Sequence, residues 1–114
     1  MIGVIGIAGC GTMGLPMAQK LESAGFDVWG YDLRSAEEFD GFQSRMITDP
    51  QAFAAKVDTV ITVVRDFPQT MDLCFDKQAI FRGQKYPKTF ICSSTISPRI
   101  LPDIVAQLPN DVTM

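Results

Sequence analysis

The chain has 114 residues, of which 46% are hydrophobic and 20% are charged, a balance typical of one ordered globular domain. It contains no histidine, which excludes Ser-His and Cys-His nucleophile pairs, a histidine general base and a histidine-ligated zinc ion. The net charge of −3 includes no long block of like charge, so the sequence lacks the footprint of a nucleic-acid binder. We expect neither a nucleic-acid partner nor a metal site.

The longest apolar stretch, residues 1–10, is too short to cross a bilayer and lacks the basic leader of a secretory signal. The three cysteines, Cys10, Cys74 and Cys92, show no CxxC spacing and are an odd number, which favours reduced thiols over a disulfide framework. The sequence therefore predicts a cytoplasmic protein without a membrane partner.

The first part of the chain alternates strand and helix patterns. A nearly all-apolar run at residues 2–8 predicts a strand buried on both faces. Apolar positions at helical spacing predict a helix over residues 12–24, with Pro16 in its first turn and Gly25 as its C-cap. A second strand is expected at residues 27–31. Ser35 and Glu38 form a capping-box pattern that predicts a short helix over residues 35–42.

The same alternation continues to the end of the chain. We predict strands at residues 45–48, 58–64 and 88–92, and helices that begin at Asp49-Pro50, near Pro68 and at Ser97-Pro98, the last ending near Leu108. Residues 109–114 would begin a sixth strand. This order indicates an α/β fold, a Rossmann-type doubly wound parallel sheet that occupies residues 1–114 as one domain.

The most informative segment is the G-x-G-x-x-G motif formed by Gly9, Gly11 and Gly14, which follows the first strand and opens the first helix. Gly9 permits a tight turn, Gly11 lets the backbone approach a pyrophosphate, and Gly14 lets the helix pack closely on the strand. The loop amides, those of Thr12 and Met13 included, and the positive helix end would hold the phosphates without a lysine.

An acidic residue is expected about twenty positions further on, and Asp32 lies eighteen residues after Gly14. Its carboxylate is suited to accept hydrogen bonds from the adenosine ribose, which favours NAD. Arg34 and Ser35 stand just beyond and are able to receive a 2′-phosphate, so NADP stays open as the cofactor. The structural alternative is that the glycines only punctuate a loop and that Asp32 is a solvated acid.

The run GVIGIAGCGTMGLPMAQKLESAGFDVWGYD resembles the N-terminal signature of the β-hydroxyacid dehydrogenase family, which includes 3-hydroxyisobutyrate, tartronate semialdehyde and 6-phosphogluconate dehydrogenases. The matching positions are Met13-Gly14, Pro16-Met17-Ala18 and Ala24-Gly25. The resemblance implies hydride transfer between a nicotinamide cofactor and a small hydroxy acid.

A second match, at residues 93–98, resembles the family's D-x-S-T-I-x-P segment at the end of the fifth strand. The resemblance implies that Ser94 contacts the substrate and that Thr95 contacts the cofactor. A helix N-terminus capped by its own hydroxyl groups is the structural alternative. Cys92 stands where the family usually has Asp, so a polar contact is expected to be missing there.

A second departure follows the fourth strand, where the family often reads Leu-Pro-Asp and this chain reads Val64-Arg65-Asp66. We count Val64 and Arg65 among the candidate cofactor contacts, because Arg65 would reach a cofactor phosphate or a substrate carboxylate from this loop. The pattern slightly favours the alternative that Arg65 is a solvated loop residue.

No lysine of the chain matches the proton-transferring lysine that the resemblance implies, and the sequence ends about where the sixth strand would begin, without a helical second domain. We therefore expect an NAD(P)-binding domain that is inactive alone, whose substrate would be a small hydroxy acid in an intact enzyme. The alternative is a stand-alone nucleotide sensor or a module completed by a partner chain. An incomplete sixth strand would expose the fifth as an edge, which permits self-association.

Overall fold

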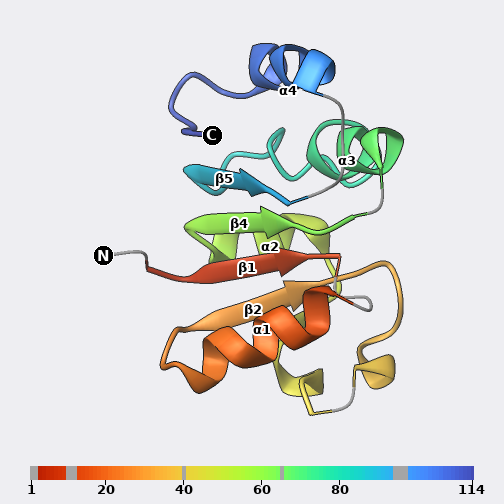
Figure 1. Cartoon of the computed structure of the whole chain (residues 1–114), viewed down its shortest axis with the longest axis vertical. Helices are drawn as coiled ribbons and strands as arrows, with labels where there is room; N and C mark the ends of the chain where they lie inside the picture. Colours follow the sequence, from red (N-terminus) through yellow and green to blue (C-terminus); the bar gives the residue numbers. More distant parts are fainter. Residues whose placement is uncertain (1–2, 10–12, 40, 65, 94–97) are drawn as a thin grey trace.

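The computed structural model describes residues 3–9, 13–39, 41–64, 66–93 and 98–114. Their strands form one parallel sheet in the order β3-β2-β1-β4-β5, of which Figure 1 shows β2, β1, β4 and β5 side by side. The five strands are β1 (Ile5–Ala8), β2 (Val28–Tyr31), β3 (Met46–Ile47), β4 (Thr59–Thr62) and β5 (Thr89–Cys92). The predicted Rossmann-type order is confirmed, since the chain runs outward from β1 to β3 and then crosses to β4 on the other side of β1.

The helices that connect these strands lie on both faces of the sheet (Figure 1). They are α1 (Gly14–Ser23), α2 (Pro50–Lys56), α3 (Phe67–Cys74) and α4 (Leu101–Gln107), the last preceded by the short 3₁₀ helix η3 (Pro98–Ile100). Helix α1 covers one face, whereas α2, α3 and α4 belong to the other. The chain thus occupies one side of β1 with β2 and β3 and the other side with β4 and β5, and the sheet is doubly wound.

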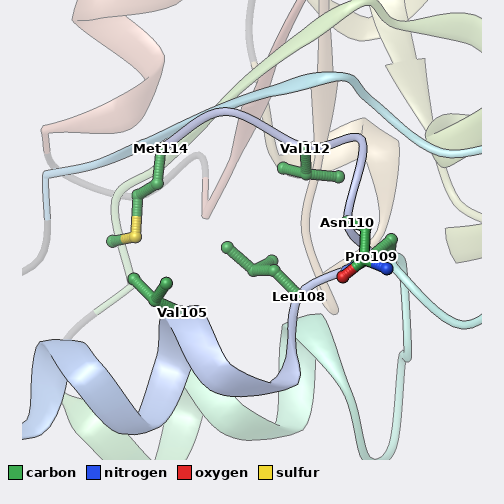
Figure 2. Close-up of a pocket in the computed structure, with 6 residues that line it drawn as sticks. All are labelled: Val105, Leu108, Pro109, Asn110, Val112 and Met114. Carbon is green, nitrogen blue, oxygen red and sulfur yellow. The ribbon is translucent and has the colours of Figure 1, made fainter.

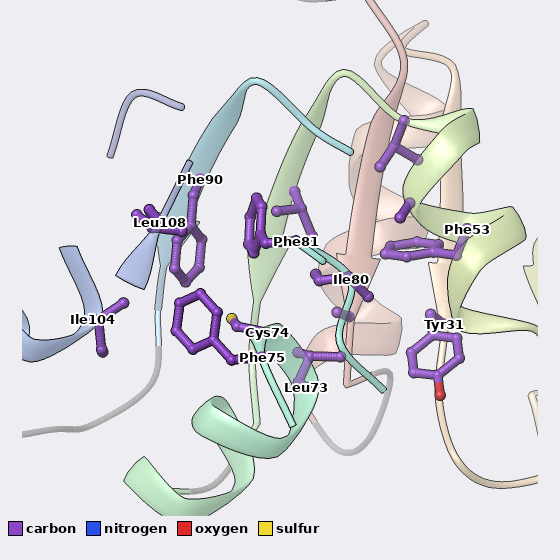
Figure 3. Close-up of a cluster of buried hydrophobic side chains, with 14 residues drawn as sticks. Tyr31, Phe53, Leu73, Cys74, Phe75, Ile80, Phe81, Phe90, Ile104 and Leu108 are labelled. Atoms are coloured by element: carbon purple, nitrogen blue, oxygen red, sulfur yellow. The ribbon is translucent and has the colours of Figure 1, made fainter. Parts of the chain in front are cut away.

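Each face of the sheet has its own apolar core, because neighbouring strand residues point to opposite faces. On the α1 face, Ile7 packs with Ala18 of the helix and with Phe39 and Phe42. On the other face, Ala8 belongs to a larger cluster that joins α2, α3, β5 and α4 (Figure 3). The larger cluster consists of Ala8, Tyr31, Phe53, Ala54, Val57, Val60, Leu73, Cys74, Phe75, Ile80, Phe81, Phe90, Ile104 and Leu108.

The caps predicted at Asp49 and Gly25 are confirmed, and Asp66 provides a third cap that was not predicted. The Asp49 carboxylate accepts a hydrogen bond from the Ala52 amide at 2.8 Å, with Pro50 at the first position of α2. The Asp66 carboxylate accepts from the Gln69 amide at 3.0 Å and starts α3. Gly25 adopts a φ of +98° and donates its amide to the Glu22 carbonyl, which ends α1 as expected.

The predicted helix over residues 35–42 is wrong. The structure has two separate 3₁₀ turns in this region, η1 (Ala36–Glu38) and η2 (Gln43–Arg45), with Gly41 between them at a φ of +79°. Ser35 accepts from the Glu37 amide at 3.4 Å through its hydroxyl, instead of capping a continuous helix. Phe39 and Phe42, three residues apart, both enter the core, a spacing that short turns satisfy.

The expected sixth strand is reduced to a single parallel bridge between Thr89 and Thr113. The Thr113 carbonyl accepts from the Phe90 amide at 2.8 Å, and the Thr113 amide donates to the Lys88 carbonyl at 2.8 Å. We call residues 109–114 the C-terminal segment. Between it and α4 lies a hollow of about 330 Å³, which is lined by Val105, Leu108, Pro109, Asn110, Val112 and Met114 (Figure 2). Within the described residues, no helix has the length and apolar character to cross a membrane.

Candidate dinucleotide site

The site predicted from the glycine motif lies where β1 and β4 are neighbours and the chain leaves them toward opposite sides of the sheet. In open α/β sheets this switch point forms a crevice at the carboxyl ends of the strands. Three backbone hydrogen bonds tie the strand ends together: Gly9 amide to Tyr31 carbonyl and Val63 amide to Ala8 carbonyl, both at 2.8 Å, and Ser93 amide to Thr62 carbonyl at 2.9 Å. These hydrogen bonds therefore hold the carboxyl ends of β2, β1, β4 and β5 together at the crevice.

Gly9 has the conformation and the surroundings that its place in the motif requires. Its φ of +95° lies in the left-handed region, which strains any residue with a side chain. A Cβ atom there would also lie 3.1 Å from both the Val63 carbonyl carbon and the Val64 amide nitrogen. Val64, a predicted cofactor contact, is thus placed directly beside the glycine turn.

Gly14 is the first residue of α1 and is buried against the end of β1. A Cβ atom on Gly14 would overlap the Gly9 carbonyl oxygen and lie 3.0 Å from the Gly9 carbonyl carbon. Because both obstacles are backbone atoms, they cannot move aside like a flexible side chain. The close helix–strand packing that the motif predicts for its third glycine is present in this geometry.

The N-terminus of α1 differs from those of α2 and α3, which are capped by aspartates. Among the described residues, Met13 provides no side-chain cap, and the first turn of α1 holds no acidic side chain. The Met13 side chain is 71% exposed. In general, a helix start presents its first amides and the positive end of the helix dipole, which together favour an anion.

Asp32 follows β2, with a side chain that is only 14% exposed. Its Oδ1 atom accepts from the Arg34 amide at 3.0 Å and lies 3.3 Å from Arg34 Nε. The Arg34 guanidinium also lies over the buried Phe39 ring, with Cζ 5.0 Å from the ring centroid. Burial raises the pKa of the neighbouring Tyr31, and the Asp32 carboxylate raises it further. The structure thus brings together Asp32 and Arg34, which the sequence offers as separate candidates for the ribose and the 2′-phosphate.

Thr62, the last residue of β4, was not singled out from the sequence. It is fully buried, and its hydroxyl has no hydrogen-bond partner among the described residues. Phe39 was also missed as a site residue, because only the turn η1 brings it beneath Arg34.

Five predicted site residues lie outside the described residues and stay predictions: Gly11, Thr12, Arg65, Ser94 and Thr95. Within the described part of the chain, no cluster of three metal-ligating side chains occurs.

The doubly wound sheet, the tight glycine turn and the uncapped helix at the switch point define a Rossmann-type dinucleotide-binding domain. Comparison with known families agrees. Residues 3–111 match the family described as the NAD binding domain of 6-phosphogluconate dehydrogenase. The chain belongs to this family, which confirms the resemblance to β-hydroxyacid dehydrogenases.

Individual relatives point the same way. The chain is 26% identical over 106 residues to human mitochondrial 3-hydroxyisobutyrate dehydrogenase, an alignment covering 91% of this chain and 32% of the relative. It is 31% identical over 96 residues to L-threonate dehydrogenase of Cupriavidus necator, covering 82% of this chain and 32% of the relative. The solved 3-hydroxyisobutyrate dehydrogenase of Mycobacterium tuberculosis, in a structure with L-serine, has a TM-score of 0.68 and 29% identity over 93% of this chain and 36% of that one. The chain spans about a third of the length of these relatives.

Proposed function

We propose that the crevice binds a nicotinamide dinucleotide, with the pyrophosphate at the N-terminus of α1. The observation that carries this proposal is that α1 begins beside the Gly9 turn at the switch point and has no side-chain cap among the described residues, unlike α2 and α3. The close contact of Gly14 with Gly9 supports it, because the packing leaves no space for a side chain at this helix start. A phosphate there would accept hydrogen bonds from the first amides of α1 and would be stabilised by the helix dipole.

At the adenosine end, Asp32 is the residue proposed to accept the ribose hydroxyl groups, as acids at this position do in dinucleotide-binding sheets. We place NAD ahead of NADP for this reason, with Arg34 as the group that would accept a 2′-phosphate. Ser94 is a proposed substrate contact. The other proposed cofactor contacts are Gly11, Thr12, Met13, Val64, Arg65 and Thr95.

The bound nicotinamide would supply hydride transfer to or from the carbon that carries the hydroxyl or carbonyl group of a small hydroxy acid. Relatives named for 3-hydroxyisobutyrate and L-threonate support this substrate class. We propose that the chain alone positions the cofactor but does not turn over, since no lysine matches the proton-transfer position implied by the family. Dehydrogenase activity of the isolated chain toward small hydroxy acids would contradict this.

The second candidate function is a nucleotide sensor or a module completed by a partner chain, with self-association at the edge of the sheet. The single bridge between Thr89 and Thr113 supports self-association, since among the described residues it pairs only the start of β5 on this side. Cofactor binding without turnover, together with a sedimentation coefficient that rises with protein concentration, would favour this function. We further propose a cytoplasmic location, to be tested by cell fractionation.

Calorimetric titration with NAD and NADP tests the main proposal. Asp32→Ala removes the ribose acceptor, and loss of hydrogen bonds to a charged group predicts NAD binding weaker by roughly tenfold to a hundredfold. Asp103→Ala, which removes an exposed carboxylate from α4, is the matched control and should leave the affinity unchanged. If neither dinucleotide binds below millimolar concentration, the proposed function is wrong.

A further inference from the structure

Asp32 is already engaged before any cofactor arrives. Its Oδ1 atom accepts from the Arg34 backbone amide at 3.0 Å and faces Arg34 Nε at 3.3 Å. A carboxylate offers about four acceptor positions on two oxygens, so these two contacts occupy much of one oxygen. A ribose diol that approaches Asp32 must use Oδ2 or displace the guanidinium.

Arg34 is held from a second side as well. Its guanidinium carbon lies 5.0 Å from the centroid of Phe39, whose ring is buried in the core of the α1 face. Stacking on an aromatic face and pairing with a carboxylate restrict the side chain to one region, although it is 49% exposed. The guanidinium is therefore positioned beside the end of β2 and still accessible to a ligand.

This arrangement affects NAD and NADP in opposite ways. For NAD, Arg34 competes with the ribose for the Asp32 carboxylate and weakens an interaction that an unengaged acid would make. For NADP, Arg34 compensates the negative charge of Asp32, which would otherwise repel a 2′-phosphate, and offers the phosphate a planar cationic donor. An acid alone would discriminate strongly against NADP, whereas a neutral pair does not.

We propose that the Asp32–Arg34 pair makes the adenosine end accept both dinucleotides, with affinities that differ by less than about tenfold. Arg34 sets this balance by occupying Asp32, and Phe39 keeps Arg34 in place. The inference rests on the proposed function, because it assumes that the adenosine ribose lies at the end of β2. It adds the specificity-determining residue of that site.

The test is a paired titration of the whole chain with NAD and NADP. Arg34→Met removes the charge and keeps an unbranched apolar stem over Phe39, and Arg34→Gln serves as a second variant. Lys85→Met is the control, since it removes an exposed positive charge elsewhere. Urea unfolding followed by Trp29 fluorescence verifies that each variant is folded.

The wild type should show Kd values within tenfold of each other, and the Kd for NADP should rise more steeply with salt. Arg34→Met should tighten NAD binding and weaken NADP binding, which changes the ratio of the two Kd values by about thirtyfold or more. Lys85→Met should leave the ratio unchanged. A wild-type preference above tenfold, or an Arg34→Met ratio equal to that of the wild type, overturns the inference while the proposed function stands. Absence of binding by both dinucleotides overturns the two together.

Discussion

Replacement of Gly14 by alanine tests the glycine turn most directly. The added Cβ would overlap the Gly9 carbonyl oxygen and lie 3.0 Å from its carbonyl carbon, so α1 must move away from β1. Overpacking of this kind costs about 1–3 kcal/mol, and the better helix propensity of alanine offsets at most about 1 kcal/mol. We expect the free energy of unfolding to fall by about 2 kcal/mol and NAD binding to weaken at least tenfold.

Gly25→Ala provides the matched control for this substitution. Gly25 has a φ of +98°, yet no described atom lies within 4 Å of the position that its Cβ would occupy. Alanine there costs about 1–2 kcal/mol through backbone strain alone, at the end of α1 far from the crevice. Urea unfolding should therefore show comparable losses for both variants, whereas calorimetry should show weakened NAD binding only for Gly14→Ala. Equal NAD affinity in the two variants would refute the proposed role of the turn.

Three further substitutions test the energetics of the fold. Ala79 has a φ of +53°, which is in the left-handed region. Because glycine relieves this strain, Ala79→Gly should raise the free energy of unfolding by about 0.5–1 kcal/mol in urea titrations. A decrease would show that the backbone is not strained there. Thr62→Val removes a buried hydroxyl without a partner among the described residues and should stabilise the chain by about 1 kcal/mol. Thr70→Val should instead destabilise the chain, since the Thr70 hydroxyl donates to the Asp66 carbonyl at 2.9 Å. Thermal midpoints that move in the same direction for Thr62→Val and Thr70→Val would contradict this account.

The strand order and the helix caps could be predicted from the sequence because their signals are local. Apolar runs mark the buried strands, and Asp49-Pro50 marks a helix start without reference to the rest of the fold. Strand ends were predicted less well. The first strand was expected at residues 2–8 but begins at Ile5. Gly3 has a φ of +75°, and the Asp58 carboxylate accepts from the Val4 amide at 2.8 Å, a contact between residues far apart in the chain.

The candidate site shows the same division. The glycine turn and Asp32 are sequence-local signals, and the structure places Gly9 and Gly14 together as the motif predicts, with Val64 beside Gly9. The engagement of Asp32 by Arg34 is supported by Phe39, which follows the 3₁₀ turn η1 (Ala36–Glu38) in a region where a longer helix was expected. A capping-box pattern alone could not indicate this, since it does not report the burial of Phe39 and Phe42.

The C-terminal segment gives a prediction that depends on pH. Asp111 accepts from the Tyr86 hydroxyl and from Lys88 Nζ, both at 2.6 Å, and these hydrogen bonds, that from Lys88 foremost, lower the pKa of Asp111. A carboxyl with a depressed folded-state pKa stabilises the bound segment above its ordinary pKa of 3.8, and this contribution is lost as the pH falls through the lowered value. The pairing of Thr113 with β5 should therefore loosen only in strong acid, which the amide NMR shifts of Phe90 and Thr113 would report.

Asp111→Asn should loosen the same pairing at neutral pH, because the amide lacks the charge that holds the ammonium group of Lys88. The matched control is Asp103→Asn on α4, which should leave both amide shifts unchanged. The Asp32 crevice lies at the opposite ends of the strands, so NAD affinity should be equal in all three proteins. Native amide shifts in Asp111→Asn would show that the two backbone hydrogen bonds hold Thr113 without the side-chain contacts, and that the charge of Asp111 does not govern the edge of the sheet.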